Sequence, residues 1–178
     1  MRSRLSCLSA LALALLSTLA LAQGDNPPAA IKGKKVCVAD VANSSLAPVF
    51  TDNLKERLLE DLQKANVNAF DATAVTVLAN QLGMSPANKR GARRQKCDYM
   101  VLSEVAKAKA GGAQTAGATA DAGGQLAVNF ALFRKGHWSA PLTANSVPFA
   151  AEGKDPNPAA IAATDQVASQ IAVALKKK

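Results

Sequence analysis

The side chains best suited to catalysis are scarce in this sequence. The chain has one histidine, His137, which stands beside its one tryptophan, Trp138, among residues typical of a turn. A serine or cysteine hydrolase would need this histidine as its base, yet no serine lies in the G-x-S-x-G pattern. The sequence also lacks C-x-x-C and H-E-x-x-H, which argues against a zinc site. We therefore expect a turn histidine, no cofactor and no metal site.

Two carboxylates follow apolar runs that are typical of buried strands. Asp40 comes after VCVA, and Glu104 comes after YMVLS. If the two strands are parallel neighbours, both side chains lie at the carboxyl edge of the sheet, where open α/β sheets bind ligands. Paired carboxylates there can do acid–base work. The simpler interpretation, which we favour, is that both are solvated strand-end residues or that Asp40 contacts a helix end. A small hydrolase using this strand-end polar site is kept as the remote alternative.

Cys37 and Cys97 are the cysteines outside the N-terminal leader. An oxidising compartment would permit one disulfide between them, but the sequence does not give their separation, so two buried thiols remain the alternative. Arg94 and Lys96 precede Cys97 and would lower a thiol pKa. A cysteine that enters a buried strand is more often inert or bridged, so we do not expect a reactive thiol.

The densest cluster of charge is basic. It consists of Lys89, Arg90, Arg93, Arg94 and Lys96. On a helix, positions 89, 93 and 96 share one face and positions 90 and 94 another. Such a cluster can bind phosphates, anionic glycan or lipid. The alternative is a solvated helix face. No aromatic residue interleaves with the cluster and phosphate-loop patterns are absent, so we expect no nucleic-acid partner.

The first residues are typical of a secretory signal peptide. Arg2 and Arg4 precede an apolar run from Leu8 to Leu16, and Ala20-Leu21-Ala22 predicts cleavage after Ala22. Lipid attachment at Cys7 is not expected, because almost no apolar segment precedes Cys7. The mature chain then has 178 − 22 = 156 residues, enough for one domain, and a formal charge of +8 − 2 = +6. No later apolar run is long enough to cross a bilayer. We expect a periplasmic or secreted protein with no transmembrane span.

The elements that must position these residues follow from apolar periodicity. Residues 23–33 read as a flexible lead-in to a single domain over 34–178, and residues 110–124 as a mobile loop rich in Gly, Ala and Thr. The predicted helices lie at 50–64, at 74–82 with further helical turns in 85–96, and from 155 onwards. The predicted strands lie at 36–39, 67–70, 99–106 and 126–132, with an edge strand at 142–150. The order β-α-β-α-β-β-β-α predicts an α/β fold with a mixed sheet and helices packed on it.

Two pairs of segments give the chain a resemblance to a known family. KKVCVADVANSS is followed by LKERLLEDLQKANVNAFD, and KCDYMVLSEVAKAK is followed by a loop and an alternating strand. The pattern resembles the envelope domain shared by the N-terminal domain of TolB, the curli secretion protein CsgG and the lipoprotein activators of penicillin-binding proteins. It departs from that pattern at Asp40-Val41, Lys96 and Ser103. The resemblance implies a noncatalytic docking or assembly module with no catalytic residues to carry over.

The sequence thus favours an interaction module of the cell envelope that is not an enzyme and binds an envelope protein. An anionic peptidoglycan or lipid surface, bound through the cluster at 89–96, is the alternative.

Overall fold

The computed structural model describes residues 33–73, 75–108, 125–150 and 155–177. The predicted signal peptide, nearly all of the lead-in and the predicted loop at 110–124 lie outside these residues. The described elements, in chain order, are β1 (Val36–Asn43), α1 (Thr51–Lys64), β2 (Ala69–Asp71), α2 (Pro86–Arg94), β3 (Tyr99–Lys107), β4 (Leu126–Arg134), β5 (Thr143–Phe149) and α3 (Asn157–Lys176).

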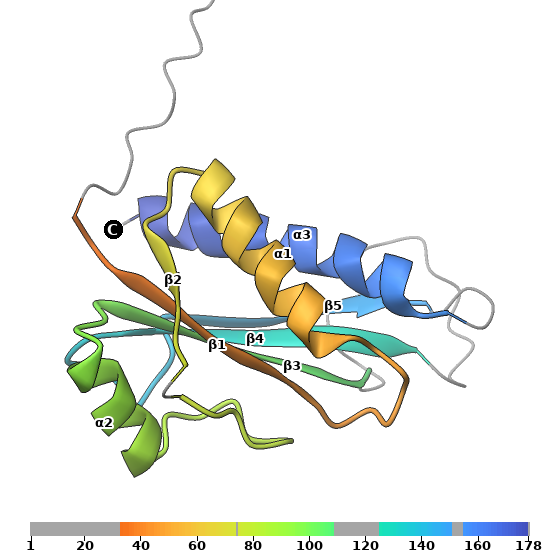
Figure 1. The fold of residues 1–178 in the computed structure, drawn as a ribbon, viewed down its shortest axis with the longest axis horizontal. Helices are drawn as coiled ribbons and strands as arrows, with labels where there is room; N and C mark the ends of the chain where they lie inside the picture. Colours follow the sequence, from red (N-terminus) through yellow and green to blue (C-terminus); the bar gives the residue numbers. More distant parts are fainter. Residues whose placement is uncertain (1–32, 74, 109–124, 151–154, 178) are drawn as a thin grey trace, which may run out of the picture.

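One mixed sheet is formed by the five strands of the described residues, in the order β2-β1-β3-β4-β5 (Figure 1). β1 pairs in parallel with β2 and β3, as expected for strands joined through helices, while β3, β4 and β5 pair antiparallel. The register of β1 on β3 shifts between Val38 and Val41. The predicted α/β class, mixed sheet and element order are confirmed.

One face of the sheet is covered by α1 and α3, which lie side by side (Figure 1). Leu54, Leu58 and Leu62 of α1 repeat every four residues, so they fall on one helix face and are all buried against the sheet. α3 buries Val167 and Ile171 in the same core. These apolar stripes are why the two helices could be recognised in the sequence.

The opposite face is covered by α2 and the segment that leads into it. Met100 and Leu102 of β3 point to this side, where Phe133 and Trp138 complete a second apolar core. Alternate residues of β3 therefore meet different cores, which is why this strand is apolar along both faces.

The predicted helix at 74–82 is wrong. The described residues 75–82 contain no helix; a turn joins an isolated bridge between Leu78 and Gln81. The stretch is rich in Val and Thr, which lose side-chain freedom in a helix. Val75 and Val77 are buried with a spacing of two, which suits extended chain. The only helix of the described residues between β2 and β3 is α2, within the predicted turns at 85–96.

The predicted edge strand is confirmed, because β5 lies at the end of the sheet order. Among the described residues, no helix combines the length and the apolar character needed to cross a membrane.

Candidate functional site

Asp40 and Glu104 follow neighbouring parallel strands, but the structure does not bring them together. Asp40 is exposed and faces α1, where the Lys55 ammonium lies 2.9 Å from Asp40 and 3.1 Å from Asp71. The hydrogen bond to Asp40 is the main cause of a raised pKa for Lys55. Asp40 is therefore an ion-paired residue at a strand end.

Glu104 lies on the other face of the sheet and is only 3% exposed. Its Oε1 accepts hydrogen bonds from the Ser44 hydroxyl and, at 2.9 Å, from the Asn80 backbone N–H. The carboxylate thus fastens two loops, one after β1 and one before α2, to the sheet. Because Asp40 and Glu104 contact different elements on opposite faces, they do not form the acid–base pair of the hydrolase alternative.

The loop of residues 44–50, called the 44–50 loop below, is held by side chains on its inner side. The side-chain oxygen Oδ1 of Asn43 accepts from the Ser45 N–H at 3.1 Å and from the Ser45 hydroxyl at 2.7 Å, and the side-chain amide of Asn43 donates to the Ala47 carbonyl at 2.9 Å. Asn43 and Ser45 thus hold the loop, whereas Phe50, the N-cap of α1, makes no capping side-chain bond.

The far end of the 44–50 loop is tied to α3. Asn157 accepts the Phe50 N–H at 2.8 Å and donates to the Pro48 carbonyl at 3.2 Å. Both ends of the loop are therefore fixed to regular elements of the domain.

The 44–50 loop presents apolar side chains to solvent. Leu46 is 92% exposed and its backbone is left-handed, with φ 65°. Phe50, the first residue of the predicted helix at 50–64, is 64% exposed. A leucine in this conformation costs about 1–2 kcal/mol compared with an ordinary backbone. Because Leu46 is both exposed and strained, it lowers the stability of the fold and gives no packing in return.

The predicted basic cluster lies on α2 and the residues after it. Ser85 is the N-cap of α2, and its hydroxyl accepts the Asn88 N–H at 3.1 Å. Asn88 and Ala92 are buried on the inner side of this helix. Arg90, Arg93, Arg94 and Lys96 are exposed, and Lys89 is half-buried. Across the described residues, none of these five forms an ion pair.

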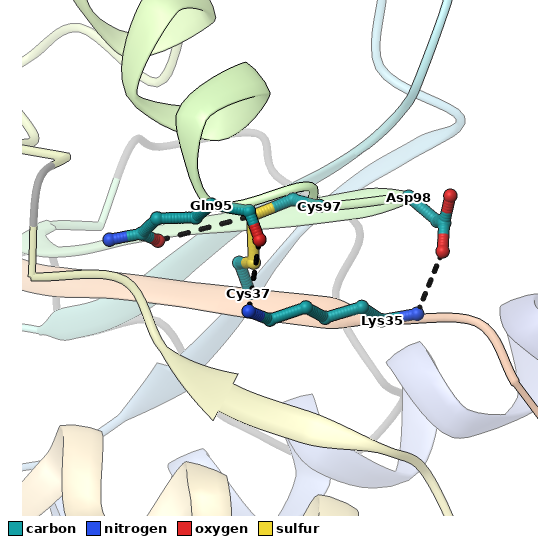
Figure 2. The surroundings of a disulfide bond; sticks show 5 residues. All are labelled: Lys35, Cys37, Gln95, Cys97 and Asp98. Atoms are coloured by element: carbon teal, nitrogen blue, oxygen red, sulfur yellow. Dashed lines mark hydrogen bonds between the residues drawn. A yellow bond between two sulfur atoms is a disulfide. The ribbon is translucent and has the colours of Figure 1, made fainter.

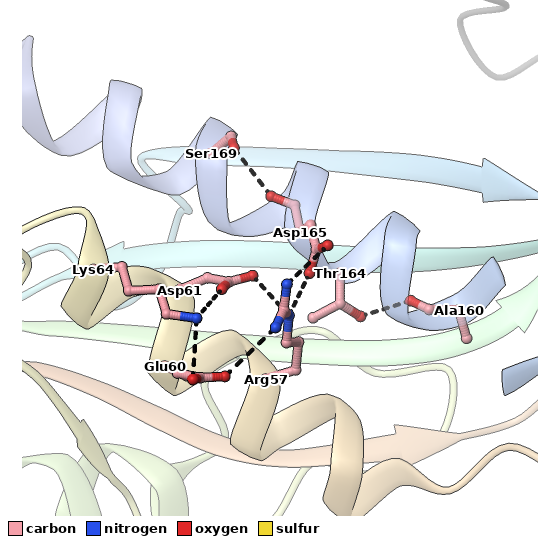
Figure 3. A network of polar contacts seen from close by, with 8 residues as sticks. All are labelled: Arg57, Glu60, Asp61, Lys64, Ala160, Thr164, Asp165 and Ser169. Carbon is pink, nitrogen blue, oxygen red and sulfur yellow. Dashed lines mark hydrogen bonds and ion pairs between the residues drawn. The ribbon is translucent and has the colours of Figure 1, made fainter. Parts of the chain in front are cut away.

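The charged residues of α1 behave differently, because they are paired with one another and with α3 (Figure 3). Arg57 contacts both carboxylate oxygens of Asp165, at 2.8 and 3.2 Å, and lies 3.2 Å from Asp61. The hydrogen bond from Arg57 lowers the pKa of Asp165, whereas burial, and then Asp165, raise the pKa of Asp61. This network joins the two helices, and Arg57 and Lys64 are both ion-paired within it.

Cys37 and Cys97 form a disulfide, with their Cα atoms 5.8 Å apart (Figure 2). Beside it, the Lys35 ammonium donates to the Gln95 carbonyl at the end of α2, at 2.9 Å, and the Lys35 N–H donates to Asp98 at 2.9 Å. The pair of bonds and the disulfide fix the end of α2 to the start of β1. Since Cys97 is bridged and buried, a reactive thiol at this position is excluded.

His137 is an exposed turn residue after β4, where its N–H donates to the Arg134 carbonyl at 2.9 Å. Arg134 pairs with Tyr99, the first residue of β3, and Glu104 lies five residues further along this strand. His137 is therefore beyond the start of β3 and away from Glu104. Among the described residues, no group of three or more His, Cys, Asp or Glu side chains is arranged to hold a metal ion.

The exposed edge of β5 is poorly suited to pairing with another strand. The Ser146 N–H donates to the Asn145 side chain at 2.9 Å, and Pro148 has no N–H. Both features remove donors that an added strand would need.

An open, mainly apolar groove of about 480 Å³ runs between β5 and the last turns of α3, lined in part by Leu142, Val173 and Lys177. It contains none of the predicted site residues.

The signals for the 44–50 loop were partly visible in the sequence. Asn43-Ser44-Ser45 with Pro48 is typical of a side-chain-stabilised turn. The exposure of Leu46 and Phe50 was not visible, because both are apolar residues of a kind that is usually buried.

No family model matches the chain, and the curated proteins yield no match. Two solved structures of PelC from Paraburkholderia phytofirmans resemble it, both described as dodecamers. One, which carries a substitution, has a TM-score of 0.49, and the other 0.44; each is 16% identical and the match covers 77% of this chain and 87% of that chain. Both TM-scores are below 0.5.

Proposed function

We propose that this protein is a noncatalytic interaction module of the cell envelope that docks a partner protein through the 44–50 loop. The carrying observation is the combination found there: Leu46 is almost fully exposed, is held in a left-handed backbone and lies on a loop fixed at both ends. Strained residues and exposed apolar residues are commonly retained for function.

The rigidity of the 44–50 loop supports this role. A loop that is already ordered loses little conformational entropy when it binds. The bonds from Asn43 and Asn157 supply that order before any partner arrives. Leucine and phenylalanine side chains then provide apolar area for a partner's pocket.

The compartment is part of the same proposal. We place the protein in the periplasm or outside the cell, after cleavage following Ala22. The support comes from the signal-peptide pattern together with the disulfide, since disulfides persist in oxidising compartments. The resemblance to the envelope domain family of TolB and CsgG points the same way.

Affinity capture from crosslinked envelope, read by mass spectrometry, tests the docking proposal. We expect one dominant protein partner with the unchanged chain. The double variant Leu46→Asn/Phe50→Ser should lose it, because both apolar contacts are removed while the loop's bonds remain. The variant Leu78→Asn is the matched control, since Leu78 is also exposed (55%) but lies on another loop.

Each part of the proposal has an outcome that would contradict it. A partner that the double variant retains as well as the unchanged chain does would contradict docking through this loop. A defined catalytic turnover that Glu104→Gln abolishes would contradict a noncatalytic role.

A second candidate function is binding to an anionic envelope surface through the α2 cluster (Lys89, Arg90, Arg93, Arg94 and Lys96). The supporting observation is the contrast with α1: in the described part of the chain, ion pairs involve the cations of α1, while those of α2 stay unpaired. Reversing the charges of Arg90, Arg93 and Arg94 should then abolish salt-sensitive binding to peptidoglycan or anionic vesicles.

A further inference from the structure

The α2 cluster does not stand alone at its end of the molecule. The turn after β4 begins with Lys135, which is exposed. The Lys135 N–H donates to the Asp98 carbonyl at 2.8 Å, directly after the disulfide, and Trp138 from the same turn shares an apolar core with Ala92 of α2. The turn and α2 therefore lie at the same end of the sheet.

The basic surface, defined as Arg90, Arg93, Arg94, Lys96 and Lys135, carries charge that its neighbours do not neutralise. α2 contains no acidic residue, and none of the five forms an ion pair within the described residues. Asp98 is the acidic residue between the two elements, and its carboxylate accepts the Lys35 N–H at 2.9 Å.

We propose that the basic surface binds an anionic phospholipid bilayer. This inference rests on the second candidate function, adds the β4–β5 turn to its surface and names its ligand. The five cations come from the end of α2 and from a separate turn, and the groove between β5 and α3 contains none of them. An array spread over two elements matches distributed headgroup charge better than it matches a single bound anion.

The surroundings of the basic surface also set the mode of binding. Trp138 is buried, so its indole is not available for insertion among lipids. The contact is therefore electrostatic and peripheral, and it is reversed by salt.

The basic surface and the 44–50 loop lie at opposite ends of β1, whose eight residues span about 26 Å. A bilayer on the basic surface leaves the 44–50 loop at the other end of β1, outside the bound surface. Membrane binding and protein docking are then compatible in one molecule.

Co-sedimentation of the chain from Gln23 onwards with lipid vesicles tests the inference. We expect binding to phosphatidylcholine vesicles that contain phosphatidylglycerol, and not to phosphatidylcholine alone. Raising NaCl from about 0.1 M to about 1 M shortens the Debye length from about 10 Å to about 3 Å and should abolish the binding.

Single substitutions locate the surface. Arg93→Gln and Lys135→Gln should each weaken the partition coefficient about five-fold. Lys107→Gln removes the same charge from an exposed site at the far end of β3 and should change it less than two-fold. Circular dichroism of each variant checks that the fold is intact.

Each other outcome is informative. If Arg93→Gln weakens binding and Lys135→Gln does not, the α2 cluster is retained and the extended surface is wrong. If Lys107→Gln acts as strongly as either, net charge alone binds the vesicles. Binding to isolated peptidoglycan without binding to anionic vesicles would show that the ligand is a cell-wall polymer, and would overturn the lipid assignment.

Discussion

Glu104 is a buried carboxylate whose hydrogen-bond donors come from two loops. Glu104→Ala removes the acceptor of the Asn80 N–H and leaves the Ser44 hydroxyl with only the Val105 carbonyl at 3.3 Å. An unpaired buried polar group costs about 1–3 kcal/mol. We expect urea unfolding to show a loss of this size. Glu104→Gln keeps an oxygen acceptor and should lose less. Equal losses for both variants would contradict a role based on hydrogen bonding.

Leu46 is strained by its left-handed backbone, a conformation that asparagine tolerates much better. Leu46→Asn should therefore raise the free energy of unfolding by about 0.5–1 kcal/mol. Thermal unfolding measures the gain, with Leu78→Asn as the control that removes an exposed leucine from a different site. A loss of stability in Leu46→Asn would mean that the side chain serves the fold.

At the scale of elements, α1 and α3 are joined by the bond between Arg57 and Asp165. Because the pKa of Asp165 is lowered from its ordinary value of 3.8, its stabilising effect is complete above that value and is lost as the pH falls through the lower folded pKa. Asp61, with a raised pKa, acts in the opposite sense.

Asp165→Asn should therefore destabilise the domain at pH 7, by at most about 1 kcal/mol because the site is solvent-screened. Below the folded pKa of Asp165, the variant and the unchanged protein should be equally stable. Chemical unfolding at both pH values tests this, and a difference that persists in acid would contradict it.

The disulfide joins Cys37 of β1 to Cys97, two residues before β3, and closes a loop with a sequence separation of 60. In the chain-entropy account, such a cross-link stabilises by about 4 kcal/mol. Cys37→Ala/Cys97→Ala should lose about this amount in denaturant unfolding. Reductant should destabilise the unchanged protein and leave the double variant unaffected.

The elements that the sequence revealed are those with a clear period. α1 shows leucines every four residues, and β4 alternates Leu126, Val128, Phe130 and Leu132 on one face. The segment at 75–82 was misread, since its β-branched residues disfavour a helix and Val75 and Val77 pack in the second core at the two-residue spacing of extended chain. Whether Asp40 and Glu104 meet could not be predicted, since it depends on which face each side chain takes beside the register shift of β1.

At the scale of the whole molecule, the sheet separates two surfaces. β1 begins beside Lys35, which is tied to the end of α2, and ends at the 44–50 loop. The basic surface and the apolar loop therefore occupy opposite ends of one rigid strand. This separation depends on the parallel pairing of β1 and β3, which fixes the positions of both surfaces.

Site-specific photocrosslinking in the native envelope tests docking through the 44–50 loop most directly. A photoreactive amino acid would replace Leu46 in one variant and Leu78, the exposed leucine of another loop, in the second. We predict one major crosslinked protein at position 46 that is absent at position 78. No crosslink at position 46, or the same products at both positions, would contradict the account.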